Sequence, residues 1–182
     1  MKVNGDTNVL KDMEDTYKLK NNKMLKLKKE LPNKLSELIE VAIKDLGKAE
    51  KSPSYKIDMG SWHDLSVVDD LCYVCFAGGI IAARVESDEG HRFINPDDFG
   101  SQEIADKFES LDLVRGYNIA VAVRIFKGYY NYGVFEKLLN ISEKLEKEIL
   151  PKIKEYTEYK DDPKQFKKNM RIIAKELKLK GY

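Results

Sequence analysis

Three segments of the chain place apolar residues on one side of a helix. From Leu35 to Leu46, apolar side chains recur at spacings of three and four residues, which is the period of a helix with one buried face. A second stripe runs from Val134 to Ile149, and a third follows Asp162-Pro163, a dipeptide typical of a helix start. The three stripes are formed by Leu35, Leu38, Ile39, Ala42, Ile43 and Leu46, by Val134, Leu138, Ile141, Leu145 and Ile149, and by Phe166, Met170, Ile173 and Leu177. We therefore expect three amphipathic helices.

An unbroken apolar run, Leu71–Ala83, lies near the middle of the chain. It predicts a helix over about residues 70–86 that is apolar on every side and so lies buried at the centre of the fold. The run contains Gly78 and Gly79, and each costs about 1 kcal/mol relative to alanine inside a helix. We expect the close approach of another backbone, or of a bound group, to compensate for them.

The remaining segments complete a mainly α prediction. A short Lys-rich helix is expected from Asn22 to Glu30, one short strand near 55–59, and a helix from Ser101 to Gly116. Residues 119–126 alternate as in a strand but contain alanines that suit a packed helix, and we choose helix because partner strands are lacking. The predicted architecture is a single-domain bundle of six or seven helices over residues 21–182, preceded by a flexible arm over residues 1–20.

Charge narrows the classes of partner. The net charge is only +1, yet both ends of the chain are rich in lysine and residues 51–133 carry more acidic than basic residues. Nucleic-acid binding through the centre is therefore disfavoured, because phosphate neutralisation needs a basic face. Nonspecific nucleic-acid contact by the Lys-rich terminal helices stays open as a weaker alternative.

Hydropathy points to a cytoplasmic location. No apolar run reaches the length needed to cross a bilayer, and residues 1–10 lack the apolar core of a secretory signal. We expect a cytoplasmic protein without membrane contact, whose two cysteines are reduced.

Both cysteines and both histidines lie between Trp62 and His91, and three interpretations of them stay open. His63, Cys72, Cys75 and His91 have the number and type of ligands of a tetrahedral zinc site. Alternatively, Cys75 is a nucleophile activated by His63 or His91. In the third and preferred interpretation the thiols are small core residues and no cofactor or metal is bound.

Aromatic and arginine residues supply the candidate binding site. Of the 18 Phe, Trp and Tyr residues, 12 lie between Tyr55 and Tyr132, and such residues are enriched at binding hot spots. The candidates for partner binding are Trp62, His63, Arg84, Arg115 and Tyr117. Each arginine can equally pair with an acid such as Asp112 or Glu109.

Three segments also resemble a group of proteins. Trp62-His63, Cys72-Tyr73-Val74-Cys75-Phe76-Ala77-Gly78 and Leu111-Asp112-Leu113-Val114-Arg115-Gly116 are similar to a tryptophan, a C-x-V-C-[LF]-A-G segment and a later L-x-x-[LV]-R-x-G segment. The pattern is that of small uncharacterised proteins of tailed bacteriophages and covers residues 62–116. The resemblance implies a phage or prophage source and carries no catalytic residue with it.

The leading functional hypothesis is a small phage-type accessory protein that binds a macromolecule, with a protein as the expected partner, and that performs no catalysis. The alternative is a metal- or thiol-dependent enzyme built on the His63, Cys72, Cys75 and His91 region. The sequence indicates no oligomeric state.

Overall fold

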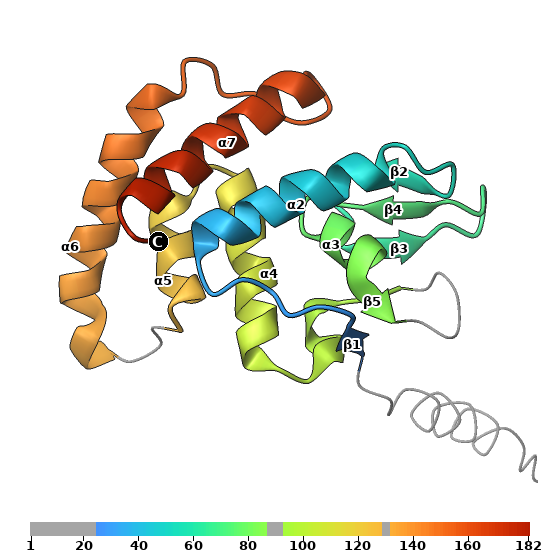
Figure 1. Cartoon of the computed structure of the whole chain (residues 1–182), viewed down its shortest axis with the longest axis horizontal. Helices are drawn as coiled ribbons and strands as arrows, with labels where there is room; N and C mark the ends of the chain where they lie inside the picture. The colour runs from blue at the N-terminus through green and yellow to red at the C-terminus, as the bar shows by residue number, and fades with distance from the viewer. Residues whose placement is uncertain (1–24, 87–92, 129–131) are drawn as a thin grey trace, which may run out of the picture.

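The computed structural model describes residues 25–86, 93–128 and 132–182. In this part of the chain it contains six α-helices and a small three-stranded mixed sheet, which confirms the mainly α prediction. The sheet lies at one end of the molecule, and α4 to α7 lie toward the other (Figure 1). The flexible arm predicted for residues 1–20, and His91, lie outside the described residues.

Helix α2 (Leu35–Ala49) joins the two ends of the molecule. Its predicted apolar stripe is buried, and the helix packs against α3 (Gly78–Arg84), α4 (Gln102–Arg115) and α7 (Pro163–Leu179). It continues three residues beyond Leu46, the last residue of that stripe, to Ala49. One continuous hydrophobic cluster extends from Leu25 to Leu177, as expected for a single domain.

The apolar run at the centre of the sequence divides into a strand and a helix, which corrects the helix predicted over 70–86. Strand β4 (Cys72–Val74) is the middle strand of the sheet, parallel to β2 (Tyr55–Ile57) and antiparallel to β3 (His63–Leu65). Helix α3 covers only Gly78–Arg84. A run that is apolar at every position shows no period, so periodicity could not distinguish a buried strand from a buried helix. The short strand expected near 55–59 is confirmed as β2.

A strand replaces the Lys-rich helix predicted for residues 22–30. Strand β1 (Lys26–Leu27) pairs antiparallel with β5 (Val85–Glu86), and Leu25 is buried. The pairing joins segments about sixty residues apart in the sequence, a contact that the local pattern of lysines and leucines does not encode.

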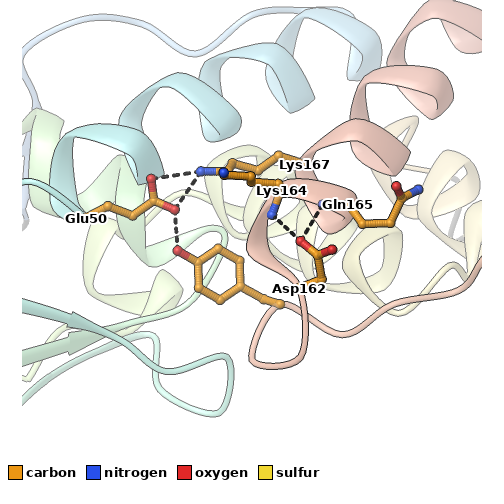
Figure 2. Close-up of polar contacts among 6 residues, drawn as sticks. Glu50, Asp162, Lys164, Gln165 and Lys167 are labelled. Carbon is orange, nitrogen blue, oxygen red and sulfur yellow. Dashed lines mark hydrogen bonds and ion pairs between the residues drawn. The ribbon is translucent and has the colours of Figure 1, made fainter.

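The helices predicted in the second half of the chain are confirmed. They are α4, α5 (Ile119–Phe126), α6 (Tyr132–Ile149) and α7. The Ser101 side chain accepts a hydrogen bond from the amide of Ile104 at the start of α4, and Asp162 accepts from the amides of Lys164 and Gln165 at the start of α7 (Figure 2). These contacts satisfy amides at the exposed helix starts. Two 3₁₀ turns, η1 (Pro96–Phe99) and η2 (Leu150–Lys152), complete the described elements.

The two glycines of the apolar run are needed for close backbone packing, as predicted. A Cβ atom at Gly78 would lie 1.7 Å from the carbonyl oxygen of Trp62. One at Gly79 would lie 2.9 Å from the Cα of Leu46 in α2. The start of α3 therefore fits against the loop before β3 on one side and against α2 on the other, and another backbone provides the expected compensation.

Candidate functional site

Cys72 and His63 meet in the core of the small sheet. The Cys72 Sγ lies 3.4 Å from both ring nitrogens of His63, and the Tyr55 ring packs edge-on against the imidazole at 5.9 Å. The Cys75 Sγ instead accepts a hydrogen bond from the amide of Gly78 at 3.3 Å. Among the described residues no three His, Cys, Asp or Glu side chains converge as metal ligands. With His91 outside these residues, the structure gives the zinc interpretation no support.

Both thiols are held in the neutral form. Burial raises the pKa of Cys72 to about 11, with a further contribution from the negative charge of Asp64. Burial likewise raises the pKa of Cys75 to about 11. The thiolate is the reactive form of cysteine, so these environments oppose the nucleophile that the enzyme hypothesis requires. They agree with the interpretation of both cysteines as core residues.

The five predicted binding residues divide into two groups. Arg84 forms an ion pair with the fully buried Asp45, at 2.5 Å, and the His63 side chain is buried. Both residues therefore make their contacts inside the protein. Trp62 is half-buried and packs against the core. Arg115 and Tyr117 lie together at an open cavity.

The segments that carry the phage-protein resemblance meet in space. The Trp62 carbonyl covers Gly78, and the charges of Asp112 and Arg115 act on the Cys75 thiol. The Trp62 segment therefore lies against the start of α3, and the end of α4 lies near Cys75.

The cavity at Arg115 and Tyr117, which we call the tyrosine cleft, has a volume of about 840 Å³. It is lined by β2 and the residues after it, by β4, by the turn that ends α4 and by the segment 156–160 before α7. Five aromatic rings line it: Tyr73, Tyr117, Tyr156, Tyr159 and Phe166. A cleft of this size is within the range that holds small-molecule ligands.

Tyr117 fixes one wall of the tyrosine cleft. Its φ of 62° is left-handed, a conformation that residues with a Cβ rarely adopt. Gly116, the expected helix stop, keeps a φ of −80°. The Tyr117 hydroxyl donates to the Thr157 carbonyl at 3.1 Å and accepts from the buried Asn169 amide at 2.9 Å. These contacts hold the segment before α7 against the end of α4.

Tyr159 is a second anchored residue of the tyrosine cleft. Its hydroxyl donates to Glu50, which also accepts from Lys167 at 2.8 Å (Figure 2). Burial, and then the hydrogen bond to Glu50, raise the pKa of this phenol, so it stays protonated at neutral pH. The Tyr159 ring packs edge-on against Phe166 at 5.6 Å. The hydroxyls of Tyr117 and Tyr159 are thus both held by hydrogen bonds.

One polar group at the tyrosine cleft has no partner. Thr157 is only 8% exposed, and its Oγ1 makes no hydrogen bond within the described residues. A buried hydroxyl left in this state costs about 1–3 kcal/mol.

A second candidate site lies along β3. Four of the seven large apolar side chains that are exposed in the described residues are Leu65, Val67, Val68 and Phe93. The first three belong to β3 and its connection to β4, and Phe93 precedes Ile94, whose amide donates to the His63 carbonyl. We call these four residues the β3 apolar surface. Strands β3 and β4 lie at the sheet end of the molecule, far from α6 (Figure 1).

The connection that presents the two valines has a defined shape. The Ser66 side chain accepts from the Val68 amide, and the Asp69 carboxylate accepts from the Leu71 amide, both at 3.3 Å. The Tyr73 hydroxyl also donates to Asp69 at 2.8 Å. The hydrogen bonds from Ser66 and Tyr73 lower the pKa of this carboxylate. Val67 and Val68 are nevertheless 94% and 92% exposed, so an ordered turn presents them to solvent.

Comparison with known proteins adds no assignment. No protein-family model, curated protein or solved structure matches the chain, so the resemblance to phage proteins stays a prediction. Within the described ranges, no helix has both the length and the apolar character needed to span a membrane.

Sequence reasoning missed most of both sites. It identified Arg115 and Tyr117, but Lys56, Tyr73 and Thr157 come to the tyrosine cleft from separate segments of the chain. No spacing links these segments. A signal for the β3 apolar surface did exist, since Val67-Val68 lies between polar turn residues, a place where solvent exposure is expected.

Proposed function

We propose that this protein acts by binding a partner protein through the β3 apolar surface and performs no covalent chemistry. The observation that carries the proposal is the near-complete exposure of Val67 and Val68 on a hydrogen-bonded turn. Adjacent exposed apolar residues on an ordered element mark interaction sites more often than isolated ones do. Rigid presentation also lowers the entropy lost on binding.

The charges around the β3 apolar surface define the partner's chemistry. Asp69 and Asp70 directly follow the two valines and are exposed. Apolar contact at the centre with charges of opposite sign around it is a common interface arrangement. The proposed partner therefore presents an apolar pocket with lysine or arginine residues at its rim.

The cellular setting is part of the same proposal. The resemblance in residues 62–116 supports a phage or prophage source, and the protein would then work in the host cytoplasm. An accessory role by binding also fits the two buried thiols, whose raised pKa values leave them neutral at physiological pH.

Site-specific photo-crosslinking tests the proposal in the native cell. A photoreactive residue replaces Val67 in one variant and Leu179 in another. Leu179 is the control position, because it is also apolar and exposed (71%) but lies near the C-terminus. We expect one discrete adduct from position 67 that is absent from position 179 and is weakened by Val68→Ser. Equal adducts from both positions, no adduct from position 67, or an adduct that Val68→Ser leaves unchanged would refute the proposal.

A further inference from the structure

The exposed face of helix α7 carries a row of five basic residues. They are Lys164, Lys168, Arg171, Lys175 and Lys178, at successive spacings of four, three, four and three residues. All five are exposed, while the opposite, apolar face of the helix is buried in the core. Because an α-helix turns about 100° and rises about 1.5 Å per residue, this α7 basic row occupies an arc of about 80° and a length of about 21 Å.

No carboxylate of the described residues forms an ion pair with the α7 basic row. The only acid of α7, Glu176, pairs with Lys152 at 2.5 Å. Two further carboxylates reach this helix and its C-terminal end, but they pair with lysines outside the row. These ion pairs are Glu50–Lys167 and Glu148–Lys180. The positive charge of the row is therefore not neutralised by the part of the chain that the structure describes.

Like charges repel one another along the α7 basic row. Each member lies three or four residues from the next, a spacing at which like charges destabilise a helix and opposite charges stabilise it. Helix α6 has the stabilising arrangement, because Glu143 lies four residues before Lys147 and Lys144 lies four residues before Glu148. The row thus costs the free protein stability that a bound polyanion would restore.

The spacing of the row is compatible with the phosphates of a nucleic acid. Duplex DNA carries one negative charge per about 1.7 Å of its axis, so a length of about 21 Å presents about twelve phosphates to the five cations. Proteins that hold single strands stack the bases on aromatic side chains. The only aromatic residue of α7, Phe166, is buried, so the row has no stacking surface and favours a duplex.

Two other anionic partners fit the row less well. A helix that binds a membrane surface inserts its apolar side chains between the lipids, and the apolar side chains of α7 belong to the core. Duplex RNA has a deep, narrow major groove, whereas the major groove of B-DNA is wide enough for an α-helix. Charge and shape together favour duplex DNA.

We propose that the α7 basic row binds the phosphate backbone of double-stranded DNA without reading the base sequence. Phosphate contacts hold a protein on the duplex but carry no sequence information. Of the two Lys-rich helices predicted near the ends of the chain, α7 is the one that forms, since residues 26–27 belong to β1. The α7 basic row shares no residue with the β3 apolar surface, and it gives the protein a second interaction surface.

Fluorescence anisotropy of a labelled DNA duplex, titrated with the full chain, tests the proposal. At about 50 mM salt we expect a Kd of about 10 µM or tighter, equal within about twofold for two duplexes of unrelated sequence. Lys164 follows the acids Asp161 and Asp162, so we expect four to five phosphate contacts. The plot of log Kd against log salt concentration should then have a slope of about 4.

Three comparison ligands make the assignment falsifiable. They are the matching single strand, an RNA duplex of the same sequence, and vesicles of phosphatidylcholine and phosphatidylglycerol. We expect each to bind more weakly than the DNA duplex. Tighter binding of any of the three, no saturable binding of duplex DNA, or a salt slope below about 2 would overturn the proposal.

Two triple variants with the same change in charge locate the binding. Lys168→Gln/Arg171→Gln/Lys175→Gln, in the row, should lower the salt slope by about 2–3 and weaken DNA binding at about 50 mM salt at least about tenfold. The control is Lys26→Gln/Lys28→Gln/Lys29→Gln, at exposed positions in and after β1, away from α7 (Figure 1). It should leave the slope unchanged, and equal weakening by the two triples would contradict the proposal.

Two further variants separate this proposal from effects on folding and from the protein interface. Glutamine forms helices about as well as lysine, so circular dichroism should show the same helix content in the row variant. The single variant Lys175→Gln should lower the salt slope by about 1, and an unchanged slope in both row variants would refute the site. Val67→Ser/Val68→Ser should leave DNA binding intact, because the β3 apolar surface lies on other elements.

Discussion

The contact between Gly78 and Trp62 yields a prediction whose sign is unusual for a helix. Replacing glycine by alanine inside a helix normally stabilises a protein by about 1 kcal/mol. At Gly78 the new Cβ would lie 1.7 Å from the Trp62 carbonyl oxygen and 3.2 Å from the Val74 Cβ. Ordinary carbon–oxygen contacts are roughly 3.2 Å or longer, so either α3 or the loop before β3 must move by more than 1 Å.

The magnitude follows from the competing contributions. Overpacking a core by one methyl group costs about 1–3 kcal/mol and more when backbone has to move, and both partners here are backbone. After subtraction of the propensity gain, we expect Gly78→Ala to lower the free energy of unfolding by about 2–4 kcal/mol. For a chain of this size that corresponds to a fall in Tm of roughly 5–15 °C.

Two other glycines provide the calibration. Gly47 also lies in a helix, but its added Cβ would meet only the flexible Glu50 side chain at 3.8 Å, so Gly47→Ala should raise Tm by about 2–4 °C. Gly79→Ala, at 2.9 Å from the Leu46 Cα, should fall between the two. Thermal melts followed by circular dichroism measure all three variants. A Gly78→Ala protein as stable as the parent, or a Gly47→Ala protein less stable than Gly78→Ala, would refute this reasoning.

Two further predictions concern the anchors of the cleft and the buried thiols. Tyr117→Phe removes the hydroxyl that hydrogen-bonds to Thr157 and the buried Asn169. Denaturant unfolding should therefore show a free energy of unfolding lower by about 1–3 kcal/mol. Tyr156→Phe is the control, and equal losses in the two variants would contradict the anchoring role of Tyr117. The thiol pKa values of about 11 exceed the ordinary value near 8.5, so the native state keeps its thiol protons longer than the unfolded state does. The corresponding stability is complete below about pH 8.5 and is lost as pH rises toward 11. The free energy of unfolding of the double variant Cys72→Ala/Cys75→Ala should therefore fall less than that of the parent between pH 8 and 11. Parallel pH profiles of the two proteins would contradict a contribution of the thiols to this pH dependence.

The sequence predicted those elements whose apolar residues carry a period. Helix α2 and helix α7 were found because each buries one stripe, and α5 was chosen correctly because no long partner strands were present. Strand β4 was missed because every position in its segment is apolar. Strand β1 was missed because its partner β5 lies far along the chain. Long-range pairing decides such short strands, and single-segment propensities do not contain it.

The sites depended on the same long-range information. Arg115 and Tyr117 could be selected as an arginine and an aromatic residue near a helix end, but the cleft itself exists only when the segment 156–160 packs back on β2. His63 and Cys72 meet because β3 and β4 are adjacent, and a helix at that point would have separated them. Residue type therefore indicated the region, and only the fold indicated which side chains share a surface.

Binding of the isolated partner is the most direct measurement of the proposed function. Once the crosslinked protein is identified and purified, its Kd is measured by calorimetry for the parent chain, for Val67→Ser/Val68→Ser and for Leu179→Ser. Burying each valine is worth about 1 kcal/mol or more, so the double variant should bind at least about tenfold more weakly, while its Tm and the affinity of Leu179→Ser stay unchanged. An affinity of the double variant within about twofold of the parent would contradict the account.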